Sequence, residues 1–422
     1  MKFLHTADIH LGAKNYGRMD SSTGLNTRLI DTQRSFDFMV ERALEEDIDC
    51  FLFCGDAYHT ADPTPTQQKI FARCLQPIAD ADIPIVLIIG NHDHPVSYGK
   101  ASSLDIFPFL DGDVHLFRRP QITVIDTKSG PLQLIAMPWP VRSLVMSKEE
   151  HRNKTPDQIK AFIEQKYVEF IQTATQAIKN GERGLDASMP TVLAGHFTVQ
   201  GAALAGSERT SLIAREPKFT VGQLAVDPID YVALGHIHHP QDRNEGHHPP
   251  VVYSGSIERV SFKERDEPKG FFFVEVESDA EGKRTSSRYV ETPARPFVAI
   301  SVDAREAAEP TEAILQAIDQ RDLADAVVRV RYRIEEAQVG LIDTQRIRQA
   351  LDEADTIASI ERSVDPAERR RRTVVTRESD LEDAIRQYVG QHDELDDLEQ
   401  DLVDAALELE NEYETQRRNE TS

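Results

Sequence analysis

Histidine, aspartate and asparagine side chains follow apolar runs of the sequence, and these residue types can ligate metal ions or move protons. One apolar run, Ile85 to Ile89, leads directly into Gly90-Asn91-His92-Asp93. Five aliphatic residues without alternation indicate a strand that is buried on both faces. Open α/β sheets bind ligands at the carboxyl ends of such strands, and a glycine there lets the backbone turn sharply. Taken alone, the tetrapeptide is equally compatible with a polar turn after a core strand.

The same arrangement recurs at four other predicted strand ends. These ends supply Asp8 with His10, then Asp56, His196, and finally His236 with His238. A single histidine at a strand end is usually structural. Packing does not explain why five successive strand ends carry such groups, so we interpret the set as one site.

The donors of this set are imidazole nitrogens, carboxylate oxygens and an amide oxygen, without a thiolate. This chemistry favours manganese or iron, allows zinc, and disfavours calcium or magnesium alone. Two ions ~3.5–4 Å apart would activate a water and hold both oxygens of an in-line phosphoryl displacement. Asp56, in the middle of the set, is the expected bridging carboxylate, and His92 is placed to protonate the leaving oxygen.

The elements that position these side chains alternate along the N-terminal part of the chain. Strands are predicted over residues 2–7, 49–54 and 85–89, with amphipathic helices over 32–46 and 65–79 between them. This alternation favours a parallel sheet. A helix is predicted over residues 156–180, and later strands are predicted over 191–194, 231–234, 251–253 and 270–276.

The composition changes near Pro293 to Pro296, where we predict a domain boundary. Residues 1–293 form the first domain, and residues 297–366 form a small α/β unit with the order β-α-β-α-β. Four consecutive arginines, Arg369 to Arg372, are expected in a solvated linker. Residues 378–416 are acidic, with fifteen Asp or Glu residues between Glu378 and Glu414. Their leucines recur at intervals of three and four, which favours helices that dock on a partner over a disordered tail.

The chain has 422 residues and a formal net charge of -24. Such acidity argues against a simple DNA-binding module. Three cysteines without zinc-type spacing indicate a reducing compartment. No run approaches the ~20 apolar residues that would cross a membrane, so we expect a cytoplasmic protein.

The ordered motifs resemble those of the calcineurin-like metallophosphoesterases, and within them the SbcD nucleases and their archaeal and eukaryotic counterparts in meiotic recombination. The resemblance covers roughly the first 275 residues. It rests on Leu4-His5-Thr6-Ala7-Asp8-Ile9-His10-Leu11-Gly12, Gly55-Asp56-Ala57-Tyr58-His59, Gly90-Asn91-His92-Asp93, Gly195-His196, Asp230-Tyr231-Val232-Ala233-Leu234-Gly235-His236-Ile237-His238 and Tyr253-Ser254-Gly255-Ser256-Ile257-Glu258-Arg259. It implies an α/β fold: a β-sandwich flanked by helices, a small α/β capping domain that binds DNA, and C-terminal helices.

The resemblance also assigns roles within the site. One metal ion would be held by Asp8, His10, Asp56 and His238, and the other by Asp56, Asn91, His196 and His236. His92 matches the catalytic histidine of the family, His59 matches a histidine associated with exonuclease action, and Asp93 would orient His92. Two Mn²⁺ per chain are expected, with Mg²⁺ or another divalent ion as alternatives.

The function implied by the resemblance is a DNA nuclease with 3′→5′ exonuclease activity on double strands and endonuclease activity on single strands. Such a nuclease would act on DNA ends in double-strand break repair and recombination, associated with the nucleoid. Its C-terminal helices would bind an SbcC-like, SMC-type coiled-coil ATPase. A homodimer is expected through the helices over residues 65–79 and 101–110, with Ile70, Phe71, Ile106 and Phe109 as exposed apolar candidates.

Two alternatives stay open. A small-molecule phosphodiesterase or protein phosphatase can use the same fold, although protein phosphatases typically continue Asp-Arg-Gly where this chain has Ala57-Tyr58-His59. A non-catalytic scaffold that tethers DNA ends is the second alternative. The complete ligand set argues against it, because ligands degenerate when catalysis is lost.

Overall fold

The structure is a computed structural model that describes residues 1–94, 100–109, 111–140, 154–206, 216–279 and 282–365, with scattered positions between 382 and 409. It divides into two compact units. The first comprises Met1–Ser301, Ala317–Val330 and Arg348–Ile360, and the second comprises Val302–Gln316, Arg331–Ile347 and Glu361–Ser422. Arg369–Arg372 and most of the predicted docking segment over residues 378–416 lie outside the described residues.

The first unit contains two six-stranded mixed sheets that pack face to face. The order of the first sheet is β14 (Gly282–Glu291), β13 (Gly270–Asp279), β1 (Lys2–Thr6), β2 (Cys50–Phe53), β3 (Ile85–Ile88) and β4 (Val114–Phe117). The order of the second is β11 (Gln241–Asp242), β12 (Val251–Tyr253), β10 (Tyr231–Gly235), β7 (Thr191–His196), β6 (Gly130–Met137) and β5 (Gln121–Thr127). Strands β1 to β4 are parallel, as are β6, β7, β10 and β12. The carboxyl ends within each parallel set therefore share one edge.

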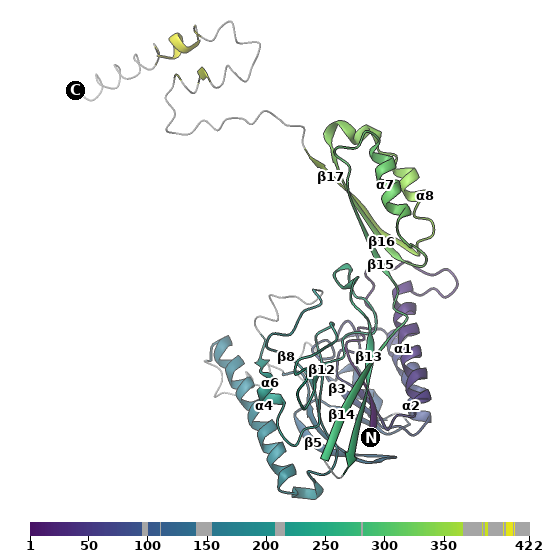
Figure 1. Ribbon diagram of the computed structural model, residues 1–422, viewed down its shortest axis with the longest axis vertical. Helices are drawn as coiled ribbons and strands as arrows, with labels where there is room; N and C mark the ends of the chain where they lie inside the picture. Colours follow the sequence, from purple (N-terminus) through teal and green to yellow (C-terminus); the bar gives the residue numbers. More distant parts are fainter. Residues whose placement is uncertain are drawn as a thin grey trace, which may run out of the picture. The chain divides into compact units, whose positions relative to one another are not determined.

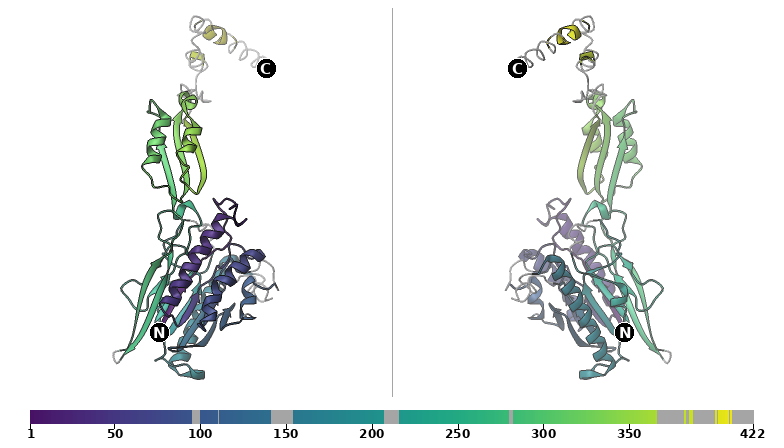
Figure 2. Two further views of the ribbon diagram at one scale, coloured as in Figure 1. Left: turned by 90° about the vertical axis from the view of Figure 1, so that its right-hand side faces the viewer. Right: turned by 90° about the vertical axis from the view of Figure 1, so that its left-hand side faces the viewer.

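Helices cover the outer faces of both sheets. Helices α1 (Thr27–Glu45) and α2 (Pro65–Asp80) pack on the first sheet, and α4 (Pro156–Lys179) with α6 (Val221–Leu224) packs on the second. Figure 1 and the two views of Figure 2 show α1 and α4 on opposite sides of the sheets. No helix in the described part of the chain combines the length and apolarity that a membrane span needs.

Strand residues alternate between two hydrophobic layers. Leu4 and Phe51 face the helices α1 and α2, whereas Phe3 and Leu52 pack between the two sheets. Both faces of these strands are therefore buried, which explains why their sequences lack polar alternation. The predicted sandwich flanked by helices is confirmed.

Three local predictions differ from the structure. Helix α1 begins at Thr27, five residues earlier than predicted, because the side chain of Asn26 caps it by accepting from the backbone N–H of Arg28. The segment predicted as a helix over residues 101–110 is a 3₁₀ helix, η1 (Ser103–Phe109), with Pro108 inside it. Strand β14 was not predicted, because it pairs only at the sheet edge and carries mostly polar residues.

The predicted β-α-β-α-β order downstream of residue 297 is present. It consists of β15 (Phe297–Asp303), α7 (Pro310–Asp319), β16 (Val327–Glu335), α8 (Thr344–Gln349) and β17 (Thr356–Asp365). The strands form a three-stranded sheet with the order β15-β16-β17. Since the division into compact units passes through these strands, the domain boundary near Pro293 stays a prediction.

A fully buried histidine joins the two sheets. His5 of β1 places Nδ1 3.1 Å from the hydroxyl of Tyr231 and Nε2 3.2 Å from the carbonyl oxygen of Leu234, both on β10. The carbonyl can only accept, so Nε2 carries the proton and Nδ1 accepts from the tyrosine. Burial lowers the pKa of His5 from 6.5 to about 3, an effect that the hydrogen bond to Leu234 only partly offsets.

We predict that His5 makes the fold sensitive to acid. The unfolded chain binds a proton at His5 as the pH falls through 6.5, whereas the folded chain does so only near pH 3. Stability is therefore complete above pH 6.5 and falls below it, by about 1.4 kcal/mol at pH 5.5. In His5→Gln this contribution should disappear, so its unfolding midpoint in urea should fall less between pH 7.5 and pH 5.5. Measurements in chelator keep metal loss out of the comparison.

The matched control is His247→Gln, because His247 is an exposed histidine. It should keep the pH sensitivity of the natural sequence. An identical fall in midpoint for His5→Gln and the natural sequence would contradict the prediction.

Candidate metal centre

The structure brings together all seven predicted metal ligands, at the carboxyl ends of five strands. The residues follow β1 (Asp8, His10), β2 (Asp56), β3 (Asn91), the end of β7 (His196) and β10 (His236, His238). We call these seven residues the metal centre. Asp8, His10 and His238 have ligand atoms within 4.8 Å of one another, and so do Asp8, Asp56 and His196.

Asp56 lies between two groups of these ligands. Its Oδ2 atom is 3.7 Å from Nε2 of His10 and 3.4 Å from Nε2 of His196. On the side of His10, Nε2 of that residue lies 2.9 Å from Nε2 of His238. On the side of His196, Nε2 lies 3.0 Å from Oδ1 of Asn91. This arrangement agrees with the predicted bridging position of Asp56.

The second group closes around the side-chain oxygen of Asn91. Nδ1 of His236 is also 3.0 Å from Oδ1 of Asn91. The backbone N–H of His236 donates to both carboxylate oxygens of Asp8, at 3.1 and 2.9 Å. The two groups are thus linked through the backbone as well as through Asp56.

Glycines allow the strand ends to approach this closely. A Cβ atom on Gly90 would lie 2.2 Å from Oδ1 of Asp56, and one on Gly55 would lie 2.4 Å from Nδ1 of His196. At Gly235, a Cβ atom would lie 2.2 Å from the carbonyl oxygen of Cys54. A side chain at any of these positions would push two strand ends apart, so the glycine of each motif is a requirement of packing.

Four of the ligands have backbone conformations that are unusual for residues other than glycine. The φ angles are 53° at Asp8, 46° at His10, 62° at Asp56 and 94° at His236. Such strain persists only where the surroundings enforce it. Backbone hydrogen bonds from Asp8 to Gly55 (2.9 Å) and from His10 to Asp56 (3.1 Å) do so here.

Each imidazole of the second group has an acceptor behind it. Nδ1 of His196 donates to the carbonyl oxygen of Cys54 at 2.7 Å, which leaves a lone pair on Nε2 in the neutral ring. That lone pair faces the lone pairs of Asn91 Oδ1. Two acceptors this close repel each other unless a cation lies between them or Nε2 of His196 binds a proton. Nε2 of His236 faces the Glu216 carboxylate at 2.9 Å. The donor set therefore fits a divalent ion with mixed nitrogen and oxygen ligands.

The pKa values of the two buried carboxyl groups of the centre are shifted in opposite directions. Burial raises the pKa of Asp8 to about 6, although nearby imidazoles oppose this shift. Burial also disfavours ionised Asp56, but His196, His92 and His10 outweigh it and lower the pKa of Asp56. His196 responds in the opposite direction: burial lowers its pKa, but Asp56 more than compensates and raises it to about 9. Asp56 therefore stays ionised to a lower pH than Asp8 does.

His92 and His59 lie together beside the metal centre. Their rings stack with centroids 5.8 Å apart, and the ring of His92 is 4.8 Å from that of His10. Nδ1 of His92 donates to the carbonyl oxygen of His59 at 2.7 Å, so Nε2 is the atom that can exchange a proton with a substrate. The catalytic roles of His92 and His59 stay predictions.

The contacts of Asp93 do not indicate its predicted role, which was to orient His92. Its carboxylate accepts from the backbone N–H groups of Asp56 (2.7 Å), Ala57 (2.9 Å) and Gly90 (3.0 Å), and His92 is oriented by the carbonyl of His59 instead. Three backbone donors from two loops converge on Asp93 because the side chain turns back into the interior, where it is fully buried. Asp93 therefore ties the second and third motifs together.

Two glutamates of the site were not predicted. Glu216 contacts His236, and Glu264 contacts Nδ1 of His238 at 3.0 Å. Neither follows a strand, and neither belongs to a local pattern that the sequence analysis could use.

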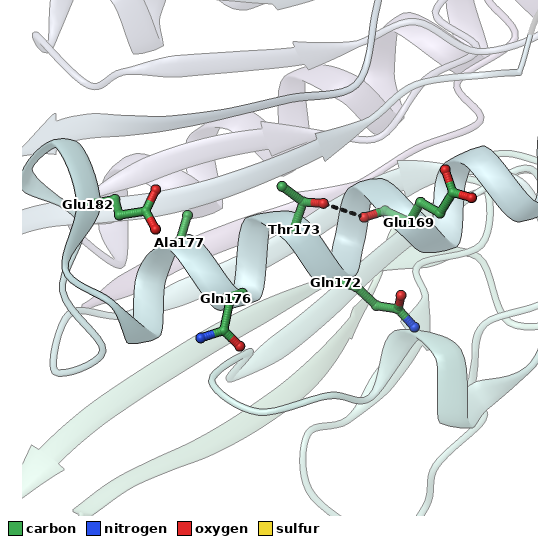
Figure 3. A pocket seen from close by; sticks show the side chains of 6 residues that line it. All are labelled: Glu169, Gln172, Thr173, Gln176, Ala177 and Glu182. Carbon is green, nitrogen blue, oxygen red and sulfur yellow. Dashed lines mark hydrogen bonds between the residues drawn. The ribbon is translucent and has the colours of Figure 1, made fainter.

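A separate pocket lies on the exposed face of α4 (Figure 3). It is lined by Glu169, Gln172, Thr173, Gln176, Ala177 and Glu182. The hydroxyl of Thr173 donates to the backbone carbonyl of Glu169 at 2.8 Å, as marked in the figure. The pocket has no imidazole and no residue of the metal centre, and we assign it no chemistry.

The chain is similar in sequence to a known protein family and to a bacterial protein. Residues 1–240 match the family model of the calcineurin-like phosphoesterases. A protein of Staphylococcus epidermidis described as a component of the nuclease SbcCD is 26% identical over 286 residues, which cover 66% of this chain and 67% of that protein. A solved structure of a dimetal phosphatase from Danio rerio aligns with a TM-score of 0.39 and 9% identity, covering 68% of this chain and 98% of that one.

We predict that Gly90→Ala disrupts the metal centre. The new methyl group would lie 2.2 Å from Oδ1 of Asp56 and 2.5 Å from its backbone nitrogen, so the bridging carboxylate must move. A displacement of about 1 Å can cost ~10²-fold in rate. Manganese content of the purified protein and hydrolysis of bis-p-nitrophenyl phosphate should both fall.

Gly222→Ala is the matched control, because no atom lies within 4 Å of its added methyl group. It should retain full manganese content and activity. Normal manganese binding by Gly90→Ala would show that the close approach at Gly90 is not required.

Proposed function

Because the chain belongs to the calcineurin-like phosphoesterase family and is a metal-dependent hydrolase, we propose that it is a two-metal DNA nuclease. The proposed activities are 3′→5′ exonuclease action on double-stranded ends and endonuclease action on single strands, in break repair and recombination. The observation that carries the proposal is the complete set of seven ligands, arranged in two groups on either side of Asp56. The bacterial relative described as part of a nuclease supports DNA as the substrate.

The metal centre and its neighbours have distinct tasks in this mechanism. Bound divalent ions would supply an activated water and charge stabilisation for the phosphodiester. Asp56 holds the two ligand groups around one carboxylate. Nδ1 of His92 donates to the carbonyl oxygen of His59, which directs Nε2 outward. In the imidazolium form, Nε2 also carries a proton, and this is the proton that would pass to the leaving oxygen and leave the neutral ring. Manganese is the proposed physiological ion.

Two described arginines of the first unit are engaged within the protein. Arg118 pairs with Asp105, and the guanidinium of Arg259 donates to backbone carbonyls, among them those of Glu267 at 3.0 Å and Arg295 at 3.2 Å. Nonspecific DNA binding relies on free Lys and Arg side chains. With a net charge of -24, we expect the chain alone to bind DNA weakly.

A partner protein would therefore supply the DNA-binding surface that this chain lacks in the proposal. An SbcC-like coiled-coil ATPase, docked on the leucine-bearing segment over residues 378–416, would add DNA-binding surface. The name of the Staphylococcus relative, as one component of a larger nuclease, supports this assignment. In the same proposal, the small α/β unit binds DNA as a cap on the nuclease domain. The protein acts in the cytoplasm, at the nucleoid.

The proposed homodimer surface is smaller than the sequence indicated. Ile70 and Phe71 of α2 are 7% and 0% exposed and belong to the core, because this face of α2 packs on the first sheet. Ile106 and Phe109 of η1 are 46% and 89% exposed. We therefore centre the dimer contact on η1.

The nuclease proposal predicts manganese-dependent cleavage of labelled linear duplex DNA that chelator abolishes. His92→Gln should keep both ions but lose ~10²-fold or more in rate, the usual scale for a general acid. Asp56→Asn should lose both ions and all cleavage, because it removes the shared carboxylate. Manganese stoichiometry and the cleavage rate are measured on the same preparations.

Substrate choice separates this proposal from the alternatives. Rapid hydrolysis of small phosphodiesters without cleavage of any DNA would favour a small-molecule phosphodiesterase. Binding of DNA ends without hydrolysis of either substrate would favour a scaffold. Full DNA cleavage by His92→Gln would exclude His92 as the general acid.

For the dimer, we predict that Phe109→Glu weakens self-association about tenfold or more, since it would place a charge in the apolar contact. Light scattering at micromolar concentration measures the effect. Met19→Glu is the control, because Met19 is 66% exposed and is not part of η1. A natural chain that stays strictly monomeric at this concentration would contradict the dimer.

A further inference from the structure

His238 has a negatively charged partner in the protein interior. Its Nδ1 atom is 3.0 Å from Oε1 of Glu264, at the end of η4 (Phe262–Glu264). A carboxylate only accepts, so Nδ1 donates and Nε2 keeps its lone pair on the side of His10. Oε2 of Glu264 accepts from the backbone N–H of Val260 at 3.0 Å. The carboxylate is thus held in place from both of its oxygens.

A buried lysine neutralises this carboxylate. Nζ of Lys269 lies 2.9 Å from Oε2 of Glu264, and both side chains are fully buried. The same ammonium contacts the hydroxyl of Ser256 at 3.0 Å and the backbone carbonyl of His238 at 3.3 Å. A buried lysine is rare and costs free energy unless it is paired. Packing alone would be served as well by an apolar side chain.

The buried imidazole of His196 has a different kind of partner. Nδ1 of His196 donates to the neutral carbonyl oxygen of Cys54, without a carboxylate. A carboxylate behind a ligand imidazole makes the ring a stronger donor to a metal ion, and loss of such a partner typically weakens metal affinity 10–100-fold. His238 is therefore a stronger donor than His196. The carboxylate of Glu216 serves His236 in the same way, but its side chain is 16% exposed, whereas that of Glu264 is fully buried.

We propose that Glu264 and Lys269 are positioning residues that set the affinity of the ion held by Asp8, His10 and His238. Glu264 strengthens His238 as a ligand, and Lys269 limits this effect by withdrawing negative charge from Glu264. Lys269 also fixes the backbone of His238 through its carbonyl. This inference rests on the two-ion centre of the proposed function and assigns the control of one of its ions.

The two residues should change metal affinity in opposite directions. Glu264→Gln replaces the charged acceptor by a neutral amide, so the ion at His238 should bind 10–100-fold more weakly. Lys269→Met leaves the carboxylate without its counter-ion, so the same ion should bind several-fold more tightly. A purely structural pair would give weaker binding in both variants.

Manganese titration of the metal-free full chain, followed by electron paramagnetic resonance, resolves the two binding steps. Circular dichroism checks that each variant is folded. The double variant Glu264→Gln/Lys269→Met removes the buried charges together and avoids an unpaired ion; it should bind as weakly as Glu264→Gln. Glu267→Gln is the control, because Glu267 contacts Lys269 at 3.4 Å and should leave both binding steps close to those of the natural chain.

Opposite shifts in the two single variants, confined to one of the two binding steps, would support the proposal. Weaker manganese binding in both single variants, or unchanged binding in both, would overturn the proposal for Glu264 and Lys269. Neither result would contradict the two-ion centre. A natural chain that binds no manganese would overturn the two-ion centre, and this inference with it. Where Lys269→Met does not fold, normal affinity in the double variant would still overturn the proposal.

Discussion

The buried carboxylate of Asp56 is the constraint on which the structure depends. Asp56 is 2% exposed, and a buried anion is tolerated only when positive charge or donors surround it. Here the imidazoles of His10 and His196 lie within 4 Å, and the backbone N–H of His92 donates to it at 2.8 Å. These groups come from both sheets. The sandwich must therefore bring the strand ends of two sheets to one point.

The backbone, more than the side chains, achieves this convergence. Gly55, Gly90 and Gly235 leave no room for a Cβ atom, and Asp56 itself has a positive φ. Asp93 then fastens the two loops that carry Asp56 and Asn91 through three backbone hydrogen bonds. These backbone constraints preorganise the ligand geometry.

The groups behind the ligand imidazoles make the centre asymmetric. Neutral carbonyls lie behind His196 and His92, whereas carboxylates lie behind His236 and His238. Of these carboxylates, Glu264 is fully buried and paired with Lys269. His236 and His238 would therefore differ as donors, because the carboxylate behind His236 is partly exposed and the one behind His238 is buried beside a lysine. This asymmetry is a property of the loops around the sandwich rather than of the strands.

The sequence by itself determined which polar residues stand at the strand ends of the candidate metal centre, because these positions and their glycines follow from local patterns. A continuous apolar run, a glycine and a polar side chain lie within ten residues of one another, and the same runs predict a sheet that is buried on both faces. The sandwich of two sheets came from the family resemblance and not from these runs. The tertiary structure alone decided the partners of these ligands. Glu264 and Lys269 lie 26 and 31 residues beyond His238, and Asp93 turned to the backbone rather than to His92. Likewise, the burial of Phe71 and the exposure of Phe109 depend on which face of each helical segment meets the sheet. Such contacts join residues that are distant in the chain, and local sequence carries no record of them.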